Sequence, residues 1–272
     1  MGHTPDITYV LSLSYGKDSL ACLEAIKQLG YPLDRVIHAD VWATDTVSAD
    51  LPLMNEFKDY ADAIIKERYG VDVEHICATC PDGSKLSYEK QFYTQISTGR
   101  NKGKVYGFPY TIGAWCTSRL KSDILKKYTQ NYLEDTNENS NVVQYLGIAA
   151  DETERIERHR RPNIVLPLVD IGWDEAYCRN WCEENKLLSP IYTNTTRGGC
   201  WFCHNQSVEE LRHLRKNYPD LWCLLMKWDK DSPHTFKSNG RTVTDFETRF
   251  CLEDNGVIAP GDSKFRWSKI LH

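Results

Sequence analysis

The chain has 272 residues, which is long enough for one large α/β domain or for one domain with a smaller addition. Its 33 basic and 38 acidic residues give a formal net charge of −5, so no overall positive field attracts nucleic acid, and such contacts would need local basic patches. The sequence contains no run of 18 apolar residues and no basic leader with an apolar core, so we expect a cytoplasmic protein without a membrane partner.

Short apolar runs alternate with amphipathic helical stretches through the first 170 residues, which is typical of β-α-β units and a mostly parallel sheet. The predicted strands are Ile7–Ser12, Arg35–Ala39, Val71–Ile76, Val142–Gly147 and Ile164–Leu166. The predicted helices are Ser19–Leu29, Pro52–Tyr69 and Cys116–Tyr128. Gly30 and Gly70 follow two of these helices, where a left-handed residue often ends a helix. We therefore expect a doubly wound, Rossmann-like α/β domain over residues 1–169.

The segment from Pro81 to Gly113 interrupts this alternation with polar residues, glycines and the basic side chains of Arg100, Lys102 and Lys104. Loops of this length inside a compact domain are usually functional lids or disordered excursions. Two interpretations stay open. The segment is either an exposed, solvated loop or a flap that closes on phosphate or on a polymeric substrate.

After Pro167 the sequence becomes rich in tryptophan and cysteine, and the connections become irregular. We expect a helical, cysteine-containing C-terminal subdomain over residues 170–272. Its predicted helices are Trp173–Lys186, Val208–Asn217 and Pro219–Lys230. The tail from Ser232 onward shows only weak periodicity, so no element is predicted there.

The segment Ser14–Ser19, with the sequence Ser-Tyr-Gly-Lys-Asp-Ser, joins the first predicted strand to the first predicted helix. Backbone N–H groups and the dipole at a helix start attract anions, and Gly16 lets the backbone come close to a phosphate. Lys17 adds a positive charge, the serines add hydroxyls, and Asp18 offers a carboxylate for a magnesium ion that bridges phosphate oxygens. The Walker-type loop is excluded, because it needs a glycine five residues before Gly-Lys-Ser/Thr. The alternative is a solvated turn capped by serines.

Polar residues follow the second and fourth predicted strands, and ligands of open parallel sheets bind beyond the carboxyl ends of the strands. Asp40 or Asp45 offers an acceptor for a ribose hydroxyl, and Gly147 would let a purine ring approach the backbone. Asp151 and Arg155 lie in the same segment as the glycine. For each acid alone, a place at a helix start is the alternative. The arginine begins a basic cluster that either grips phosphate or forms a solvated helix face.

Ten cysteines in a chain of this size indicate metal ligands, reactive thiols or buried packing residues before a disulfide framework. Cys200 and Cys203 form a Cys-x-x-Cys pair at the start of a helix, where both thiolates reach one metal. Alternatively, they are reduced thiols packed beside the aromatic residues between them. Cys77 and Cys80 form a second such pair, which is either a redox pair or part of the core. The cysteines that we interpret as helix packing residues are Cys22, Cys178 and Cys182.

The order Ser-x-Gly-Lys-Asp-Ser resembles the PP-loop of the ATP pyrophosphatases, the adenine nucleotide alpha hydrolase-like superfamily, with Tyr15 where the family has a glycine. Three later segments resemble, in the same order, motifs of the phosphoadenosine phosphosulfate (PAPS) reductase family within that superfamily. These segments are Gly147–Arg155, Pro167–Tyr177 and Leu187–Cys203. The resemblance covers most of residues 7–203, and its specificity lies in the order of the motifs.

That family also has an Arg/Lys-Trp-Cys-x-x-x-x-Lys motif, which Trp115–Lys121 matches apart from an alanine before the tryptophan. Family members with an iron–sulfur cluster hold it by a Cys-Cys pair here and by the later Cys-x-x-Cys. This chain keeps Cys116, Cys200 and Cys203 but has Thr117 in place of the second cysteine. The resemblance therefore implies an iron–sulfur cluster, or alternatively Zn²⁺, at a site that could leave one iron open to sulfide or substrate. The candidates for a fourth ligand are His204, Cys223 and Cys251.

The resemblance implies an enzyme that binds ATP with Mg²⁺, cleaves the α–β phosphate bond to adenylate an acceptor, and transfers sulfur to it. The catalytic residues it implies are Lys17, Asp18 and Ser19. The nucleotide-binding residues it implies are Ser14, Gly16, Lys17, Asp18, Ser19, Asp40, Gly147, Asp151 and Arg155. The expected partners are an adenine nucleotide, a sulfur-donor protein and a nucleic-acid acceptor.

Two other functions stay open. One is reduction of an adenylated sulfate, but reductases of the family carry a nucleophilic cysteine in a C-terminal Glu-Cys-Gly-x-His motif. Here the late cysteine is Cys251, and neither the glycine nor the histidine follows it. The other is a nucleotide-binding module that catalyses no reaction.

Overall fold

The computed structural model describes residues 7–109, 114–128, 141–193, 199–262 and 265–269. Its centre is an all-parallel sheet of five strands in the order β3-β2-β1-β4-β5. The strands are β1 (Ile7–Ser12), β2 (Arg35–Asp40), β3 (Val73–Cys77), β4 (Asn141–Tyr145) and β5 (Ile164–Val165). Because β4 pairs with β1 on the side opposite β2, the sheet is doubly wound, and the predicted α/β class is confirmed.

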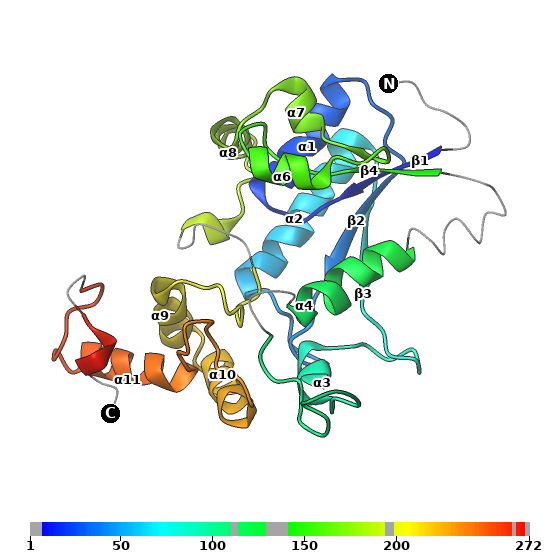
Figure 1. The fold of residues 1–272 in the computed structure, drawn as a ribbon. Helices are drawn as coiled ribbons and strands as arrows, with labels where there is room; N and C mark the ends of the chain where they lie inside the picture. Colours follow the sequence, from blue (N-terminus) through cyan, green and yellow to red (C-terminus); the bar gives the residue numbers. More distant parts are fainter. Residues whose placement is uncertain (1–6, 110–113, 129–140, 194–198, 263–264, 270–272) are drawn as a thin grey trace.

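The helices fall into two groups in Figure 1, one around the sheet and one beyond the ends of β2 and β3. Those around the sheet are α1 (Lys17–Gln28), α2 (Pro52–Tyr69), α6 (Thr153–His159), α7 (Pro167–Ile171) and α8 (Glu175–Glu184). The others are α3 (Tyr88–Tyr93), α4 (Trp115–Thr117), α9 (Val208–Asn217), α10 (Pro219–Asp231) and α11 (Val243–Asp254). Short turns of other helix types occur at Ser118–Ser122 (π) and at Pro190–Thr193 and Trp267–Lys269 (3₁₀).

Local signals explain where the long helices begin and end. α2 has Pro52 in its first turn, where the missing N–H costs nothing, and ends at Gly70 with a φ of 71°. The Gly70 N–H donates to the Lys66 carbonyl at 3.0 Å and closes the last turn. α9 begins with a capping box, in which Ser207 and Glu210 bond to each other's backbone. No helix among the described residues is both long and apolar enough to cross a bilayer.

Buried side chains form two separate clusters. The first joins the sheet to α1, α2, α7 and α8, and it includes Leu11, Leu20 and Cys182. The second joins α3, α9, α10 and α11, and it includes Phe92 and Trp228. The predicted division into residues 1–169 and 170–272 stays a prediction.

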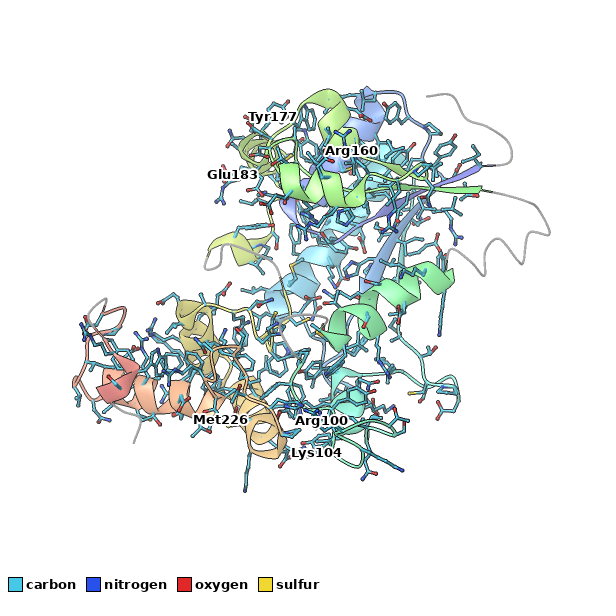
Figure 2. All side chains as sticks on the ribbon, viewed as in Figure 1. Arg100, Lys104, Arg160, Tyr177, Glu183 and Met226 are labelled. Atoms are coloured by element: carbon cyan, nitrogen blue, oxygen red, sulfur yellow. The ribbon has the colours of Figure 1, made fainter. Side chains whose placement is uncertain are left out.

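The part of the segment 81–113 that the structure describes is packed against α10. Its helix α3 contributes to the second core, and residues 95 and 105 form an antiparallel bridge that closes the loop beyond it. The Tyr93 hydroxyl donates to Asp231 at 2.6 Å, and the Phe108 N–H donates to the Ser232 hydroxyl at 3.0 Å. Figure 2 shows Arg100 at the outer end of this loop, where its side chain is exposed. Residues 110–113 lie outside the described residues.

Candidate functional site

The candidate site begins where strand order reverses, beyond the carboxyl ends of β1 and β4. The turn after β1 leads into α1, and the turn after β4 contains Gly147. A Cβ atom on Gly147 would lie 2.6 Å from the Cα of Ser19 and 2.8 Å from the carbonyl oxygen of Asp18. This glycine therefore lets the β4 turn pack directly on the first turn of α1, a role that we did not predict for it.

Two serine hydroxyls hold the turn after β1 together. The Ser19 hydroxyl accepts from the Ser14 N–H at 3.1 Å, donates to the Gly16 carbonyl at 3.0 Å, and lies 3.0 Å from the Ser14 hydroxyl. Gly16 is the N-cap of α1 and has no side chain to cap the helix, and the Lys17 N–H instead donates to the hydroxyl of Tyr192. The loop is therefore shaped before any ligand arrives, as a phosphate cradle requires.

Tyr15 lies where the PP-loop motif that this segment resembles has a glycine. Its backbone is left-handed, with a φ of 55°. That conformation is uncommon for a residue with a side chain, so other contacts must hold it. The tyrosine is fully buried, its hydroxyl donates to Asp62 of α2, and His75 Nε2 lies 3.0 Å from the same oxygen. Burial and the bond to Asp62 raise the pKa of the hydroxyl, which therefore stays protonated. The aromatic side chain thus anchors the phosphate loop to α2.

Lys17 is held by carboxylates beside the loop. Its Nζ lies 2.8 Å from Asp18 and 3.5 Å from Glu175, and the Lys17 N–H donates to the Tyr192 hydroxyl at 3.3 Å. Burial opposes the charged lysine, but the hydrogen bond and charge of Asp18 raise its pKa. Asp18, Glu152 and Glu175 each place one oxygen within 4.8 Å of the others, so they are a candidate group for a cation.

The other predicted nucleotide contacts differ in where they lie. Arg155 faces the cavity described below and is paired with Glu152 at 3.0 Å. Asp40 accepts from Lys58 at 2.9 Å and from His75 at 2.8 Å. Burial alone would raise the pKa of Asp40. The hydrogen bonds from His38 and His75 and the charge of Lys58 outweigh burial and hold this pKa far below its ordinary value. Asp151 accepts from the first N–H of α8 at 3.1 Å. Neither aspartate is among the described residues that line the cavity. Their roles with a nucleotide stay predictions.

A cavity of about 380 Å³ connects the phosphate loop to the Cys-x-x-Cys pair. On the loop side, it is lined by Ser14, Gly16, Asp18, Ser19, Gly147 and Arg155. Cys200 and Cys203 line the same cavity. Its floor contains Lys58, which is buried and lies 2.6 Å from Asp50. Neither Lys58 nor Asp50 belongs to a motif, and we did not predict them.

A second cavity, of about 610 Å³, lies on the other side of the cysteines and is lined by all three predicted thiols, Cys116, Cys200 and Cys203. The two cavities share Lys121, which comes from the π turn after α4. Burial raises the pKa of Cys200 to about 12 and also raises that of Cys116, while the lysine charge opposes the shift at Cys200. These thiols are therefore protonated at neutral pH, and a metal must displace their protons on binding.

The spacing of the three sulfurs can be compared with the spacing that one bound zinc ion requires. Three sulfurs bonded to one zinc ion at about 2.3 Å lie only about 3.8 Å apart. Among the described residues, the groups with three donor atoms within 4.8 Å of one another are carboxylate and histidine groups, so at least two of the sulfurs of Cys116, Cys200 and Cys203 lie more than 4.8 Å apart. The three thiols would therefore have to move to bind one zinc ion together.

The remaining cysteines take other positions. Of the candidates for a fourth ligand, His204 lines the second cavity. Cys223 is exposed on α10, and the Cys251 thiol on α11 donates to Glu247 at 3.2 Å. The helix cysteines that we interpreted as packing residues are buried in the first core, which confirms that prediction. They are Cys22, Cys178 and Cys182.

Comparison with known proteins gives distant relatives. No protein-family model matches the chain. It is 23% identical over 235 residues to an uncharacterized protein of Methanocaldococcus jannaschii, a match that covers 81% of this chain and 40% of that protein. It is 30% identical over 108 residues to an uncharacterized nin region protein of Escherichia phage lambda, covering 40% of this chain and 34% of that protein. The chain thus matches less than half the length of either relative.

Among solved structures, the U34-tRNA thiolase NcsA from Methanococcus maripaludis, with its 4Fe–4S cluster, is similar at a TM-score of 0.37 and 14% identity. The similarity covers 84% of this chain and 73% of that chain. It is too distant to indicate a function for this protein.

Proposed function

We propose that this chain is a PP-loop enzyme that uses ATP and Mg²⁺ to adenylate an acceptor and then replaces the activated oxygen with sulfur. The observation that carries the proposal is that one cavity is lined both by the phosphate loop and by Cys200 and Cys203. A nucleotide on the loop and sulfur at the thiols would then meet in one cavity.

The first step would take place at the loop. An acceptor carbonyl oxygen attacks the α-phosphorus, the α–β P–O bond breaks, and pyrophosphate leaves with the bonding electron pair. The N–H groups at the start of α1 and the hydroxyls of Ser14 and Ser19 would stabilise the negative charge that builds up on the phosphates. Lys17 would turn from Asp18 and Glu175 toward the nucleotide, and Asp18 would then be available to Mg²⁺.

The second step would take place at the thiol end of the cavity. Sulfide attacks the carbon that carries the adenylated oxygen, the C–O bond breaks, and AMP leaves with that oxygen. Sulfur stays at the oxidation level of sulfide, so no reductant is needed. Cys116, Cys200 and Cys203 would hold an iron–sulfur cluster, which would supply an iron able to bind sulfide. At least two of their sulfurs lie farther apart than the sulfurs around one zinc ion.

The acceptor would enter through the second cavity. Lys121 and Lys126 line it beside a single carboxylate, Asp123, so the charged residues of the lining carry a net positive charge, which favours an anionic acceptor such as nucleic acid. The sulfide would come from a sulfur-donor protein or from solution.

Reduction of an adenylated sulfate finds less support. Cys251 would be its nucleophile, but its thiol donates to Glu247, and that hydrogen bond raises its pKa. A thiol with a raised pKa carries little of the reactive thiolate. The described residues that line the two cavities do not include Cys251.

The proposal is tested with anaerobically purified protein, ATP labelled at the α-phosphate, Mg²⁺, sulfide and total cellular RNA as acceptor. We expect labelled AMP and an equal amount of pyrophosphate. Labelled ADP, or ATP that binds without any turnover, would overturn the adenylation step, and the second result would favour a nucleotide-binding module. Sulfite released from adenylated sulfate by the wild type, but not by Cys251→Ser, would establish the reductase instead.

A further inference from the structure

Tyr88, the first residue of α3, lies among residues that adjoin the three thiols. Its ring centroid is 4.9 Å from that of Trp115 and 4.2 Å from that of Phe202. Trp115 directly precedes Cys116, and Phe202 lies between Cys200 and Cys203 in the sequence. Tyr88 also lines the second cavity together with all three cysteines. The fold thus brings one phenol to the place where the two thiol segments meet.

The Tyr88 side chain is held firmly in this position. The Tyr88 N–H donates to the Trp42 carbonyl at 2.7 Å, and the next N–H of α3 donates to the carbonyl of residue 43 at 2.9 Å. These bonds fix the start of α3 on the segment that follows β2. The ring also lies 5.1 Å from Trp228 of α10, so aromatic groups surround it. A large swing of the hydroxyl away from the cavity would break this packing.

The Tyr88 hydroxyl is buried, and none of the described residues forms a hydrogen bond with it. The whole residue is only 1% exposed, so bulk water does not compensate. A buried hydroxyl without a partner costs about 1–3 kcal/mol, and folded proteins rarely retain one without a use. The sulfurs of Cys116, Cys200 and Cys203 line the same cavity as Tyr88 and are candidate acceptors for its proton.

We propose that the Tyr88 hydroxyl donates a hydrogen bond to a sulfur of the metal group held by Cys116, Cys200 and Cys203, and so acts as a positioning residue for that group. The inference rests on the proposed function, because it requires a metal group at the thiols. Hydrogen bonds to ligand or inorganic sulfur withdraw negative charge, which stabilises the reduced form of a cluster and the thiolate form of a ligand.

The test compares Tyr88→Phe with Tyr93→Phe, a matched control on the same helix. The Tyr93→Phe variant also loses a hydroxyl, but in the wild type that hydroxyl donates to Asp231 of α10. Tyr93 is not among the described residues that line the second cavity. Each protein is purified anaerobically and reconstituted with iron and sulfide. Three quantities are measured: the rate of iron release to a chelator, the reduction potential, and the urea midpoint of the metal-free protein.

For Tyr88→Phe we expect iron release faster by about tenfold, the size typical for loss of a group that supports metal ligands, and a lower reduction potential. The metal-free variant should have a urea midpoint equal to or above that of the wild type, because the substitution removes an unpaired buried hydroxyl. Tyr93→Phe should show the reverse pattern, with a lower midpoint and unchanged iron release and potential.

Iron release and potential that stay unchanged in Tyr88→Phe would overturn the inference, and so would a metal-free midpoint lowered as much as in Tyr93→Phe. Both results leave the proposed function standing if the wild type binds iron and Cys116→Ser does not. A wild type that binds neither iron nor zinc overturns the inference and the metal part of the proposed function together.

Discussion

The phosphate loop lines the first cavity, and the three thiols line the second cavity, which we call the thiol cavity. These two regions are built in different ways. The loop is one continuous segment, and its side chains are already paired: Ser14 with Ser19, Lys17 with Asp18, and Tyr15 with Asp62. The thiol cavity draws on three distant segments, around residues 88, 116 and 200, and it contains a hydroxyl that no described residue partners.

This difference indicates how each region meets its ligand. The loop has its shape without a nucleotide, so binding should cost little reorganisation. Burial raises the pKa of the Cys116 and Cys200 thiols, and the three sulfurs do not all lie within 4.8 Å of one another, so this region should reach its final arrangement only with the metal group. Changes in one region should therefore leave the other largely intact, although Cys200 and Cys203 border both cavities.

The largest effect is expected for Cys200→Ser. Removing one of three ligands should abolish iron binding after anaerobic reconstitution, while the affinity for ATP with Mg²⁺ changes less than about twofold, because the loop does not depend on the thiol. Iron analysis and calorimetric titration measure the two. Cys223→Ser, exposed on α10, is the control and should keep the iron. A Cys200→Ser protein that keeps its iron, or that loses ATP affinity as strongly as it loses iron, would contradict the independence of the two regions.

Gly147→Ala should have the next largest effect. The added methyl would meet the backbone of α1 at 2.6 Å, which cannot give way as a flexible side chain can. We expect a loss of about 3 kcal/mol in the free energy of unfolding, measured with urea, and weaker ATP binding. Gly199→Ala, where a Cβ would meet no atom within 4 Å, should keep its stability. Equal stability of the two variants would contradict the close packing of the β4 turn on α1.

Tyr15→Phe tests the anchor of the loop. The variant keeps the ring but loses the hydrogen bond to the charged Asp62, so we expect a loss of about 1.5–3 kcal/mol in the free energy of unfolding and weaker ATP binding. Iron content should stay the same. If Tyr15→Phe binds ATP as the wild type does, the anchor supports only the fold and not the loop.

The smallest effect is a pH dependence of stability from His75. Hydrogen bonds to Asp40 and Asp62 raise its pKa from 6.5 to about 9. Because the folded protein holds this proton more tightly, the stabilising contribution is complete below about pH 6.5 and is lost as the pH rises through 9. Urea midpoints measured between pH 6 and 10 should fall for the wild type. The part of this fall due to His75 should vanish in His75→Gln, and an identical profile for both proteins would contradict the assignment.

Much of the sheet domain could be predicted because its signals are local. β1 and α2 were predicted to the residue, since apolar runs, Pro52 and Gly70 mark their ends. α11 was missed in a weakly periodic tail, although the capping box of Thr242 and Asp245 marks its start. α3 was missed because it is short and lies in a glycine-rich segment. Its buried face is recognisable only from the second core, to which distant helices contribute.

In the candidate site, too, the residues brought together by local sequence could be predicted, and those that depend on distant contacts could not. Ser14, Gly16 and Ser19 could be predicted from one motif because a strand, a turn and a helix bring them together without help from the rest of the chain. Because ligands of parallel sheets bind beyond the carboxyl ends of the strands, the sequence predicted Asp40 near the site. It could not show that Lys58 and His75 bind the Asp40 carboxylate. Nothing in the sequence around residue 88 indicated a role, because that role depends on contacts with segments far along the chain.

The most direct test of the account follows sulfur and nucleotide in one reaction. Anaerobic protein is incubated with ³⁵S-sulfide, total cellular RNA and ATP with Mg²⁺, and both the label in RNA and the AMP released are counted. The account predicts label that requires ATP, in equal amount to AMP, and no label with Cys200→Ser. AMP released without label, or label that forms without ATP, would contradict the claim that the phosphate loop and the thiols serve one reaction.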